Sequence, residues 1–564
     1  MSRRRLDRFQ GLRRRLGLAA ACATLALGSA AARAESKAPE NVLNLTCRRR
    51  VESPGLGGAC RVVEKAVTWD PKQTAVIVCD MWDLHHCLNA VRRETDMAPR
   101  MDLLLTSLRH RGVTIVHAPS SCMDAYQDHR ARRRAVSTPR SKNLPEGIAQ
   151  WCKRIPTEEQ AAYPVDQSDG GEDDDPAEHD RWAAKLASMG RNPKAPWKSQ
   201  TDLITIDPEN DYISDDGREI WSILEDRGID HVLLMGVHLN MCVLGRPFGL
   251  RQMARNGKDV ALVRDMTDTM YNPLTAPFVS HFTGTDRVVE HVERFVCPTV
   301  DSNQILGGAP FRFKTDHRPR VVFVIAEDEY KTETTLPPFA AVYLGINDRV
   351  SYVFDRADEK NDLPGLEKAL DQADVLVVSA RRRVLPTAQV AALRRFVAEG
   401  KAVVGIRTAG HAFAGRAAVA VPTGHDVWKG FDPEVLGGRY TNHHKEGPET
   451  AVAVVPGASS HAILSGVDVA HLVGKGSLYK VSPLTDSATP LLLGAIPGAA
   501  PEPIAWTHLT DAGGRVFYTS LGHPADFAQP AFNRLLRNAI DWTAGLPVAA
   551  TVKTSSAQPI PFPK

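Results

Sequence analysis

The amino-acid sequence predicts an α/β protein made of two open-sheet domains, each with three layers. Its 564 residues are too many for one compact core, so at least two domains are expected. Short apolar runs typical of buried strands alternate with helical patterns, and this alternation occurs twice along the chain. Hydrophobic residues make up 43% and charged residues 24%, as in ordinary globular proteins.

The first 34 residues have the features of an export signal. An arginine-rich segment from Arg3 to Arg15 precedes an uncharged, mostly apolar run at 16–28, and the small-x-small sequence Ala32-Arg33-Ala34 follows. We therefore expect residues 1–34 to be a cleavable signal peptide and the mature protein to be periplasmic or secreted. The apolar run is too short to span a bilayer as a mature helix. Sec export and twin-arginine export both stay open.

The positive charge of the chain belongs to this segment. Removing residues 1–34 takes away eight arginines and one aspartate, so the formal net charge falls from +3 by seven, to −4. The mature charge gives no reason to expect a nucleic-acid partner. No later stretch is long and apolar enough for a stable membrane span. The expected partner is a small-molecule substrate, and a homo-oligomer is left open.

Residues 35–65 are predicted to be a short, strand-rich extension. Cys47 and Cys60 flank a Pro/Gly-rich turn at 53–58. An exported compartment permits disulfides. We expect a Cys47–Cys60 disulfide that closes a hairpin, with two unpaired thiols as the alternative.

The first domain is expected at residues 66–298. Apolar runs predict strands at 74–79, 113–117, 231–237 and 260–264. A polar insertion interrupts this domain at 124–200, and its acidic stretch at 166–180 is predicted to be a solvated loop. Long loops near a site can act as lids, so the insertion is expected near the pocket.

A Gly/Pro-containing linker is expected at 299–319, a second α/β domain at 320–546 and a tail at 547–564. Strands of the second domain are predicted at 321–325, 350–354, 375–379, 402–406 and 515–519, and helices at 387–398 and 530–542.

A cysteine stands at the turn after the predicted strand 231–237, in the sequence G-V-H-L-N-M-C-V at 236–243. A helical pattern follows, and the N-terminus of a helix favours a thiolate, which is a nucleophile. The alternative for Cys242 is a buried structural cysteine.

A carboxylate, Asp80, ends the predicted strand 74–79. Sites in open α/β sheets form at the carboxyl ends of strands, so Asp80 could serve as general base to a thiol on a neighbouring strand. The alternative for Asp80 is a turn or helix-capping role.

Together these two segments resemble the isochorismatase-like cysteine hydrolases, the superfamily that includes nicotinamidases. That family has an aspartate at the end of its first core strand and a G-V-x-x-N-x-C turn, which Gly236, Val237, Asn240 and Cys242 match. The resemblance covers about residues 66–298 and continues in G-K-D-V-A-L-V-R-D at 257–265. It implies that Asp80 takes the thiol proton and that Cys242 attacks the carbon of a small amide or a related C–N or ether compound.

The same resemblance implies an oxyanion hole and a pocket. A cis peptide is expected at Val237–His238, with an oxyanion hole formed by Val237, His238 and Cys242. The expected ligand-binding residues are Trp82, His86, His117 and Asn240. Nicotinamidases hold a metal through an Asp-x-His pair after the second strand, where this chain has H-A-P-S-S at 117–121. We therefore expect no metal and no cofactor, and the group Asp83, His85 and His86 is expected to form a polar pocket wall.

One member of the family's catalytic set is missing. The family has a lysine at the end of the strand before the nucleophile strand, and the corresponding strand here is predicted at 202–206. It runs into D-P-E-N-D without a lysine, and Lys198 comes too early. Acids near a thiol raise its pKa, so we expect nicotinamidase activity to be weak or absent. Any retained chemistry needs another positive charge, for instance His238, Arg246 or a metal.

The second domain resembles the ThuA-like, trehalose-utilisation family, whose flavodoxin-like fold is that of class I glutamine amidotransferases. The matching motifs are G-I-R-T-A-G-H-A-F at 405–413, L-G-G-R-Y-T-N-H-H at 436–444, P-I-A-W at 503–506 and G-R-V-F-Y-T-S-L-G-H at 514–523. A glutaminase needs a cysteine after its central strand, but no cysteine follows Cys297. Arg407, His411, His443 and Trp506 are expected to line a polar pocket for a sugar. Ordinary structural roles for these residues are the first alternative and metal binding is the last.

Two functions follow. The first is an exported cysteine hydrolase of a small amide or related compound, joined to a ThuA-like domain that binds a sugar. The second is a catalytically degenerate, secreted carbohydrate-binding or assembly protein. Thiol reactivity distinguishes them, because a catalytic Cys242 is expected to react quickly with iodoacetamide at neutral pH.

Overall fold

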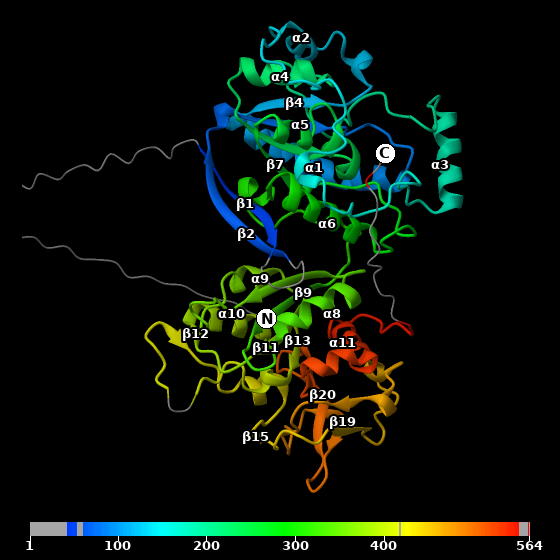
Figure 1. Ribbon diagram of the computed structural model, residues 1–564. Helices are drawn as coiled ribbons and strands as arrows, with labels where there is room; N and C mark the ends of the chain where they lie inside the picture. Colours follow the sequence, from blue (N-terminus) through cyan, green and yellow to red (C-terminus); the bar gives the residue numbers. More distant parts are fainter. Residues whose placement is uncertain (1–41, 53–59, 417–418, 552–561, 563–564) are drawn as a thin grey trace, which may run out of the picture. The chain divides into compact units, whose positions relative to one another are not determined.

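The computed structural model describes residues 42–52, 60–416, 419–551 and 562. The predicted signal peptide lies outside the described residues. Two large mixed sheets organise the chain, which confirms the predicted α/β class (Figure 1). Within the described ranges, none of the helices has the length and apolar character needed to cross a membrane.

The first sheet has the strand order β2-β1-β8-β7-β6-β3-β4-β5. The strands from β8 to β5 run parallel, and β1 and β2 are antiparallel. The bounds are β1 (Leu43–Glu52), β2 (Cys60–Trp69), β3 (Thr74–Cys79), β4 (Thr114–Ala118), β5 (Tyr212–Ile213), β6 (His231–Gly236), β7 (Asp259–Thr267) and β8 (Thr299–Val300). β3 and β6 lie side by side near the middle, and β3 is buried along its whole length.

Helices cover both faces of this sheet. Helix α1 (Leu88–Arg111) packs with Val76 and Val78 on one face. On the opposite face, Ala75 and Ile77 pack with α4 (Gly217–Asp226), α5 (Leu250–Arg255) and α6 (His281–His291). Because strand side chains alternate between faces, the apolar run of β3 supplies both cores.

Within the insertion at 124–200, the acidic stretch at 166–180 differs from the predicted solvated loop. The insertion contains α2 (Arg130–Ser137) and α3 (Pro176–Ser188), and it buries Tyr163, Val165 and Trp182. Its acidic stretch also contacts the rest of the domain. Asp173 forms an ion pair with Arg93, and Asp174 accepts hydrogen bonds from the N–H groups of the first residues of α1. The acidic residues therefore anchor the insertion and cap a helix.

Three further expectations are corrected. β1 and β2 form a hairpin in which Cys47 lies opposite Lys65 and Cys60 opposite Glu52. Five residues of extended strand separate positions 47 and 52, about 17 Å, so this register rules out the expected disulfide. The predicted linker begins with β8 of the first sheet and α7 (Asn303–Leu306). Residues 202–206 form a turn without strand structure, and the strand before β6 is the two-residue β5.

The second sheet has the order β10-β9-β11-β13-β21-β20-β19-β16-β17. The strands from β10 to β21 run parallel, and the others are antiparallel. The bounds are β9 (Arg320–Ala326), β10 (Arg349–Phe354), β11 (Val375–Ala380), β13 (Ala402–Ile406), β16 (Thr450–Val454), β17 (Val473–Gly474), β19 (Thr489–Ala495), β20 (Glu502–Leu509) and β21 (Arg515–Thr519). Two short ladders pair β12 (Leu385–Pro386) with β14 (His425–Asp426) and β15 (Asn442–His443) with β18 (Tyr479–Lys480).

Helices also cover both faces of the second sheet. α8 (Leu336–Tyr343) and α11 (Pro530–Thr543) pack with one core, and α9 (Leu366–Gln372) and α10 (Thr387–Ala398) pack with the other. Short helical turns complete the chain: η1 (Pro71–Gln73), η2 (Met123–Tyr126), η3 (Pro156–Glu158), η4 (Leu239–Val243), η5 (Val292–Val296), η6 (Thr332–Thr334), η7 (Arg407–His411), η8 (Phe431–Leu436), η9 (Ala462–Leu464), η10 (Val469–His471) and η11 (Pro524–Ala528).

Candidate active site

Cys242 lies just beyond the carboxyl end of β6. The chain leaves β6 at Gly236, passes a cis peptide between Val237 and His238, and enters the π-helical turn η4. Gly236 has a φ of 112°, and a Cβ at this position would lie 2.0 Å from the carbonyl oxygen of Cys79. Only glycine allows β3 and β6 to approach this closely while the chain turns toward Cys242.

Asp80 lies beyond the end of β3, the strand that pairs with β6. Its side chain is fully buried and its φ is 48°. Oδ1 accepts the backbone N–H of Ser120 at 2.8 Å, and Oδ2 accepts the Nε–H of Arg246 at 3.0 Å and forms an ion pair with its Nη2 at 2.9 Å. The carboxylate also acts on the thiol of Cys242 and raises its pKa. The two residues therefore interact at the ends of the paired strands β3 and β6, where a general base is needed.

The thiol is protonated at rest. Burial, followed by the charge of Asp80, raises the pKa of Cys242, and Arg246 and the N–H of His238 only partly oppose this. The thiolate expected from a helix N-terminus is therefore disfavoured, because desolvation and a neighbouring carboxylate outweigh the helix dipole. Cys242 needs its proton removed as it attacks a substrate.

The backbone around Cys242 corrects part of the expected oxyanion hole. The N–H of Val237 donates to the carbonyl oxygen of Cys79 at 3.0 Å, as part of the contact between β3 and β6. It is therefore occupied and unable to bind an oxyanion. The N–H of His238, in contrast, acts on Cys242 and lowers the pKa of its thiol.

Asn240 braces the nucleophile turn and is not a pocket residue. Its side-chain amide exchanges hydrogen bonds of 2.7 and 2.9 Å with the backbone of Met270. The backbone carbonyl oxygen of Asn240 accepts hydrogen bonds from the hydroxyl of Tyr163 at 2.7 Å and from the side-chain amide of Gln167 at 2.8 Å, both from the insertion. The insertion is thus anchored directly on the turn that carries Cys242.

An aromatic wall lies after Asp80 in the sequence. Trp82 stacks on Trp197 with ring centroids 4.6 Å apart, and its Nε1 donates to the carbonyl of Ser120 at 3.1 Å. His85 contacts His86 at 4.1 Å and His238 at 4.9 Å. The structure therefore brings Trp82 and His86 together with His238, and adds Trp197, which no sequence motif indicates.

His117, expected in the pocket, is instead a buried structural residue. Its two ring nitrogens lie 3.0 Å from Oε1 of Gln200 and 3.1 Å from Oδ2 of Asp211, and none of its surface is exposed. Arg109 also binds Asp211. This group fixes β5 beside β4 and leaves no ring nitrogen for a ligand.

His238 and Glu94 carry no charge at neutral pH, although the ion pair of Arg93 with Asp268 acts on both of them. Burial lowers the pKa of His238 to about 3 and raises the pKa of Glu94 on α1, to which the charge of Asp268 adds. Oε1 of Glu94 and Nε2 of His238 lie 3.8 Å apart, and neither has a hydrogen-bond partner among the described residues. Glu94 had no sequence signal, because it lies inside an ordinary amphipathic helix.

The described residues include two groups with the spacing of metal ligands: Cys87, Asp173 and Asp174, and Glu172, Asp174 and His179. Asp173 binds Arg93 at 2.8 Å, and Asp174 caps α1 through hydrogen bonds of 2.7 Å. Asp83 from the expected polar wall pairs with Arg191 at 2.8 Å. Internal partners therefore account for these carboxylates.

The cation beside Asp80 is Arg246, four residues after Cys242. Its backbone N–H donates to the carbonyl oxygen of Cys242 at 2.9 Å, so one helical turn carries both residues. Lys198 is exposed, and its backbone N–H binds Asp83. Of the sources of positive charge that the sequence suggested, Arg246 is in contact with the base, and His238 is neutral.

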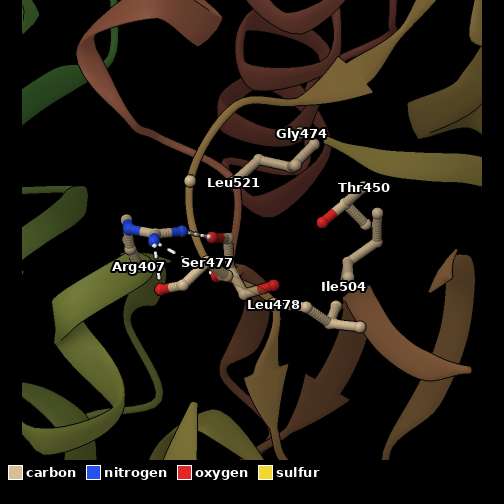
Figure 2. Close-up of a pocket in the computed structure, with 9 residues that line it drawn as sticks. Arg407, Thr450, Gly474, Ser477, Leu478, Ile504 and Leu521 are labelled. Atoms are coloured by element: carbon tan, nitrogen blue, oxygen red, sulfur yellow. Dashed lines mark hydrogen bonds between the residues drawn. The ribbon is translucent and has the colours of Figure 1, made fainter. Parts of the chain in front are cut away.

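Arg407, expected in a second pocket, occupies the strained turn after β13, with a φ of 43°. Its guanidinium lies between the rings of Tyr330 and Tyr479, at 4.3 and 4.7 Å, and donates to the carbonyl of Ser520 at 2.6 Å and to Ser477 at 3.2 Å. Figure 2 shows Arg407 and Ser477 beside a small cavity that Thr450, Ile504 and Leu521 also line. Its volume of about 10 Å³ has room for about one water and none for a sugar.

The other three residues expected in this pocket lie in different surroundings. His411 stacks on Tyr440 at 4.5 Å, and its buried Nδ1 has no partner among the described residues. Exposed His443 lies 6.4 Å from the ring of Tyr479. Trp506 is fully buried, donates to the carbonyl of Leu436 at 2.6 Å and packs on Tyr518, so it belongs to the core and not to a pocket.

Sequence and structure comparisons show which known proteins the chain is similar to. A family model described as ThuA, trehalose utilisation, matches residues 320–543. A search of curated proteins found no match. A putative ThuA-like protein from Parabacteroides merdae is 14% identical, with 42% of this chain and 98% of that chain covered and a TM-score of 0.31.

The chain is also similar to solved structures of a cysteine hydrolase and of an isochorismatase family protein. A cysteine hydrolase from Pseudomonas syringae pv. phaseolicola is 15% identical, with 42% of this chain and 93% of that chain covered and a TM-score of 0.26. An isochorismatase family protein from Desulfovibrio vulgaris is 12% identical, with 40% of this chain and 94% of that chain covered and a TM-score of 0.22. Residues 320–543 thus match the ThuA family model, and the solved structures to which the chain is similar include a cysteine hydrolase and an isochorismatase family protein.

Proposed function

We propose that the first domain is a cysteine-dependent hydrolase of a small amide or a related C–N or ether compound. The observation that carries this proposal is the interaction of Asp80 with Cys242 at the carboxyl ends of the adjacent strands β3 and β6. A structural cysteine would need no buried carboxylate beside it, since that carboxylate costs desolvation and raises the thiol pKa.

Acylation starts from the protonated thiol and the ionised carboxylate. Asp80 takes the proton as the sulfur of Cys242 attacks the amide carbon, so an S–C bond forms and negative charge moves to the substrate oxygen. The N–H of His238, which favours negative charge on the sulfur, is the proposed backbone donor to this charge. The tetrahedral species collapses as the C–N bond breaks, and Asp80 returns the proton to the leaving nitrogen.

Hydrolysis of the thioester repeats these steps with water. Asp80 takes a proton from the water, the hydroxide adds to the thioester carbon, and the C–S bond then breaks. The carboxylic acid leaves, and the proton on Asp80 returns to the sulfur. Atoms and charge balance without a metal or a cofactor, and the resting state is regenerated.

The substrate is proposed to be small, planar and uncharged. Cys242 is only 7% exposed, and the nearby wall of Trp82, Trp197, His85 and His86 is aromatic. Glu94 and His238, whose ring centroid lies 4.9 Å from that of His85, are also neutral. An ionic substrate would lose its hydration in this site without gaining a free charged partner.

A panel of primary amides, ureido compounds and imidates tests this proposal through product release by the full chain. Cys242→Ala and Asp80→Asn are each expected to abolish turnover while the unfolding temperature stays near that of the wild type. Turnover by the alanine variant at the wild-type rate would falsify the role of Cys242. The alternative function, a degenerate binding or assembly protein, predicts no turnover by any of the three proteins.

For residues 320–543 we propose sugar binding near His411. The family description of this segment and the unpaired, buried Nδ1 of His411 beside Tyr440 and Tyr479 support this. Burial, with the charges of Arg382 and Arg381, lowers the pKa of His411 to about 3, so it offers a neutral hydrogen-bonding nitrogen. Calorimetric titration with trehalose and glucose tests it: binding that His411→Phe removes supports the site, and unchanged binding places the sugar elsewhere.

Export completes the proposed function, and only the sequence of residues 1–34 supports it. The arginine-rich start, the apolar run and the Ala32-Arg33-Ala34 site form a complete signal peptide pattern.

A further inference from the structure

The candidate active site holds two side chains that can become anions and one cation in contact with them. Its positive and negative charges are therefore not balanced in every protonation state. Asp80 and Cys242 can each become an anion, whereas Arg246 is the cation in contact with them. Cys79 also faces the site from β3, but burial raises the pKa of its thiol and keeps it neutral. His85, His238 and Glu94 add no charge, because burial neutralises each of them.

Arg246 is held in place on two sides. Nε and Nη2 bind the same oxygen of Asp80, at 3.0 and 2.9 Å. The guanidinium also lies over the ring of Trp151, 4.8 Å from its centroid, and that ring packs against Gly245, where a Cβ would lie 2.7 Å from it. A cation clamped between a carboxylate and an aromatic face keeps its position when the charge beside it moves.

The electrostatic effect of Arg246 reaches both potential anions. It acts on Cys242 as the main influence that favours the thiolate, while Asp80 disfavours it. Its own pKa is raised by Asp80 and by Cys242, against the effect of burial, so it stays charged throughout. Two anions and one cation in this buried space are unfavourable, but one anion and one cation are balanced.

We propose that Arg246 is a shared counter-ion, whose guanidinium pairs with the carboxylate of Asp80 at rest and with the thiolate of Cys242 once the proton has moved to Asp80. This inference rests on the proposed hydrolase chemistry, and it adds the residue that stabilises charge in a chain without the family's lysine. The step is a single proton transfer: the S–H bond breaks, the O–H bond on Asp80 forms, and the negative charge moves from oxygen to sulfur beside an unchanged cation.

The proposal makes opposite predictions for its two partners. In Arg246→Met the thiolate loses its cation, so the pKa of Cys242 rises and alkylation slows. In Asp80→Asn the opposing anion is lost while the cation remains, so the pKa of Cys242 falls and alkylation accelerates. A nearby charge shifts a pKa by about 1–3 units, and each unit changes the alkylation rate about threefold once the nucleophilicity of the thiolate is included.

The experiment measures the rate at which iodoacetamide alkylates Cys242 in the full chain between pH 6 and 9, followed by peptide mass spectrometry at that cysteine. We expect about threefold or slower alkylation of Arg246→Met, partial recovery in Arg246→Lys, and about threefold or faster alkylation of Asp80→Asn. The double variant is expected to lie between the two single variants.

Arg109→Met is the matched control. Arg109 binds Asp211 through the same two nitrogens, at 3.0 and 2.7 Å, with 14% of its side chain exposed against 18% for Arg246. This substitution removes a comparable ion pair elsewhere in the same domain, and we expect it to leave the alkylation rate of Cys242 unchanged.

Two results would overturn the proposal. One is an alkylation rate in Arg246→Met equal to the wild type in a protein that unfolds cooperatively. The other is slower alkylation in Asp80→Asn, which would mean that the carboxylate promotes the thiolate. Because the readout needs no substrate, the counter-ion role can fail while amide hydrolysis stands, and amide hydrolysis can fail while the counter-ion role stands.

Discussion

At the scale of single residues, the site has one negative charge to share between Asp80 and Cys242. Burial and the neighbouring carboxylate keep the thiol protonated, so the cysteine is not a preformed nucleophile. This differs from the rapid labelling at neutral pH that the helix position of Cys242 suggests. Reactivity in the wild type should therefore increase as the pH rises, since deprotonation of the thiol limits it.

Activity on nicotinamide is the first prediction at this scale. Without a lysine beside the nucleophile, and with the thiol pKa raised, we expect kcat/KM for nicotinamide below about 10⁴ M⁻¹s⁻¹. Release of nicotinic acid, measured by chromatography, checks this. A value at or above that level would show that Arg246 fully replaces a lysine.

Residue identity in the two motifs could be predicted, but side-chain direction could not. Asp80 and Cys242 were found because strand ends and a glycine-containing turn mark them. Asn240 and His117 were expected in the pocket because they stand beside the motifs, yet Asn240 binds Met270 and His117 binds Asp211. These partners lie on other elements, and a single sequence does not reveal which neighbour a polar side chain will reach.

At the scale of elements, the strands buried on both faces were predictable and the two-residue strand β5 was not. β3, β13 and β21 have the bounds that the sequence predicts, because continuous apolar runs specify them. β5 has only two residues, and its place in the sheet depends on the ion pair of Asp211 with Arg109 and on its hydrogen bond with His117. The apolar residues at 203–206 therefore suggested a strand at the wrong position.

The insertion is predicted to depend on a buried ion pair. Glu158 in η3 binds Arg251 of α5 at 2.8 Å and His291 of α6 at 2.7 Å. Burial alone would raise the pKa of Glu158, but these hydrogen bonds outweigh it and lower the pKa to about 2. The unfolded value is about 4.3, so ionised Glu158 stabilises the fold above about pH 5, and this stabilisation is lost as the pH falls toward 2.

Glu158→Gln is expected to lower the free energy of unfolding by about 3 kcal/mol at pH 7, because it leaves Arg251 buried without its carboxylate. The difference from the wild type should shrink below pH 4. Urea unfolding at several pH values measures both effects. Glu178→Gln, which removes an exposed pair with Arg92, is the control and should change little. A pH-independent difference would contradict the assignment of this stability to an ionised Glu158.

At the scale of the whole molecule, each of the two sheets has apolar cores on both faces, so each satisfies the requirements of an independent α/β core. The sequence could predict this layering because apolar periodicity is repeated in every long strand. It could not predict the hairpin register that separates Cys47 from Cys60, since the paired positions depend on the whole β1–β2 ladder and not on the two cysteines.

Export predicts a defined mature N-terminus. If residues 1–34 are removed after Ala34, the mature chain begins at Glu35. N-terminal sequencing of protein from a bacterial periplasm measures this. Recovery of the full-length chain from the cytoplasm alone would contradict export.

The central claim is that Cys242 hydrolyses a small amide with Asp80 as base. Ammonia release by the full chain from a panel of uncharged primary amides tests it most directly, with Cys242→Ala in parallel. We predict release from at least one amide by the wild type and none above buffer by the variant. Equal release by both proteins, or no release by the wild type from any amide of the panel, would contradict the claim.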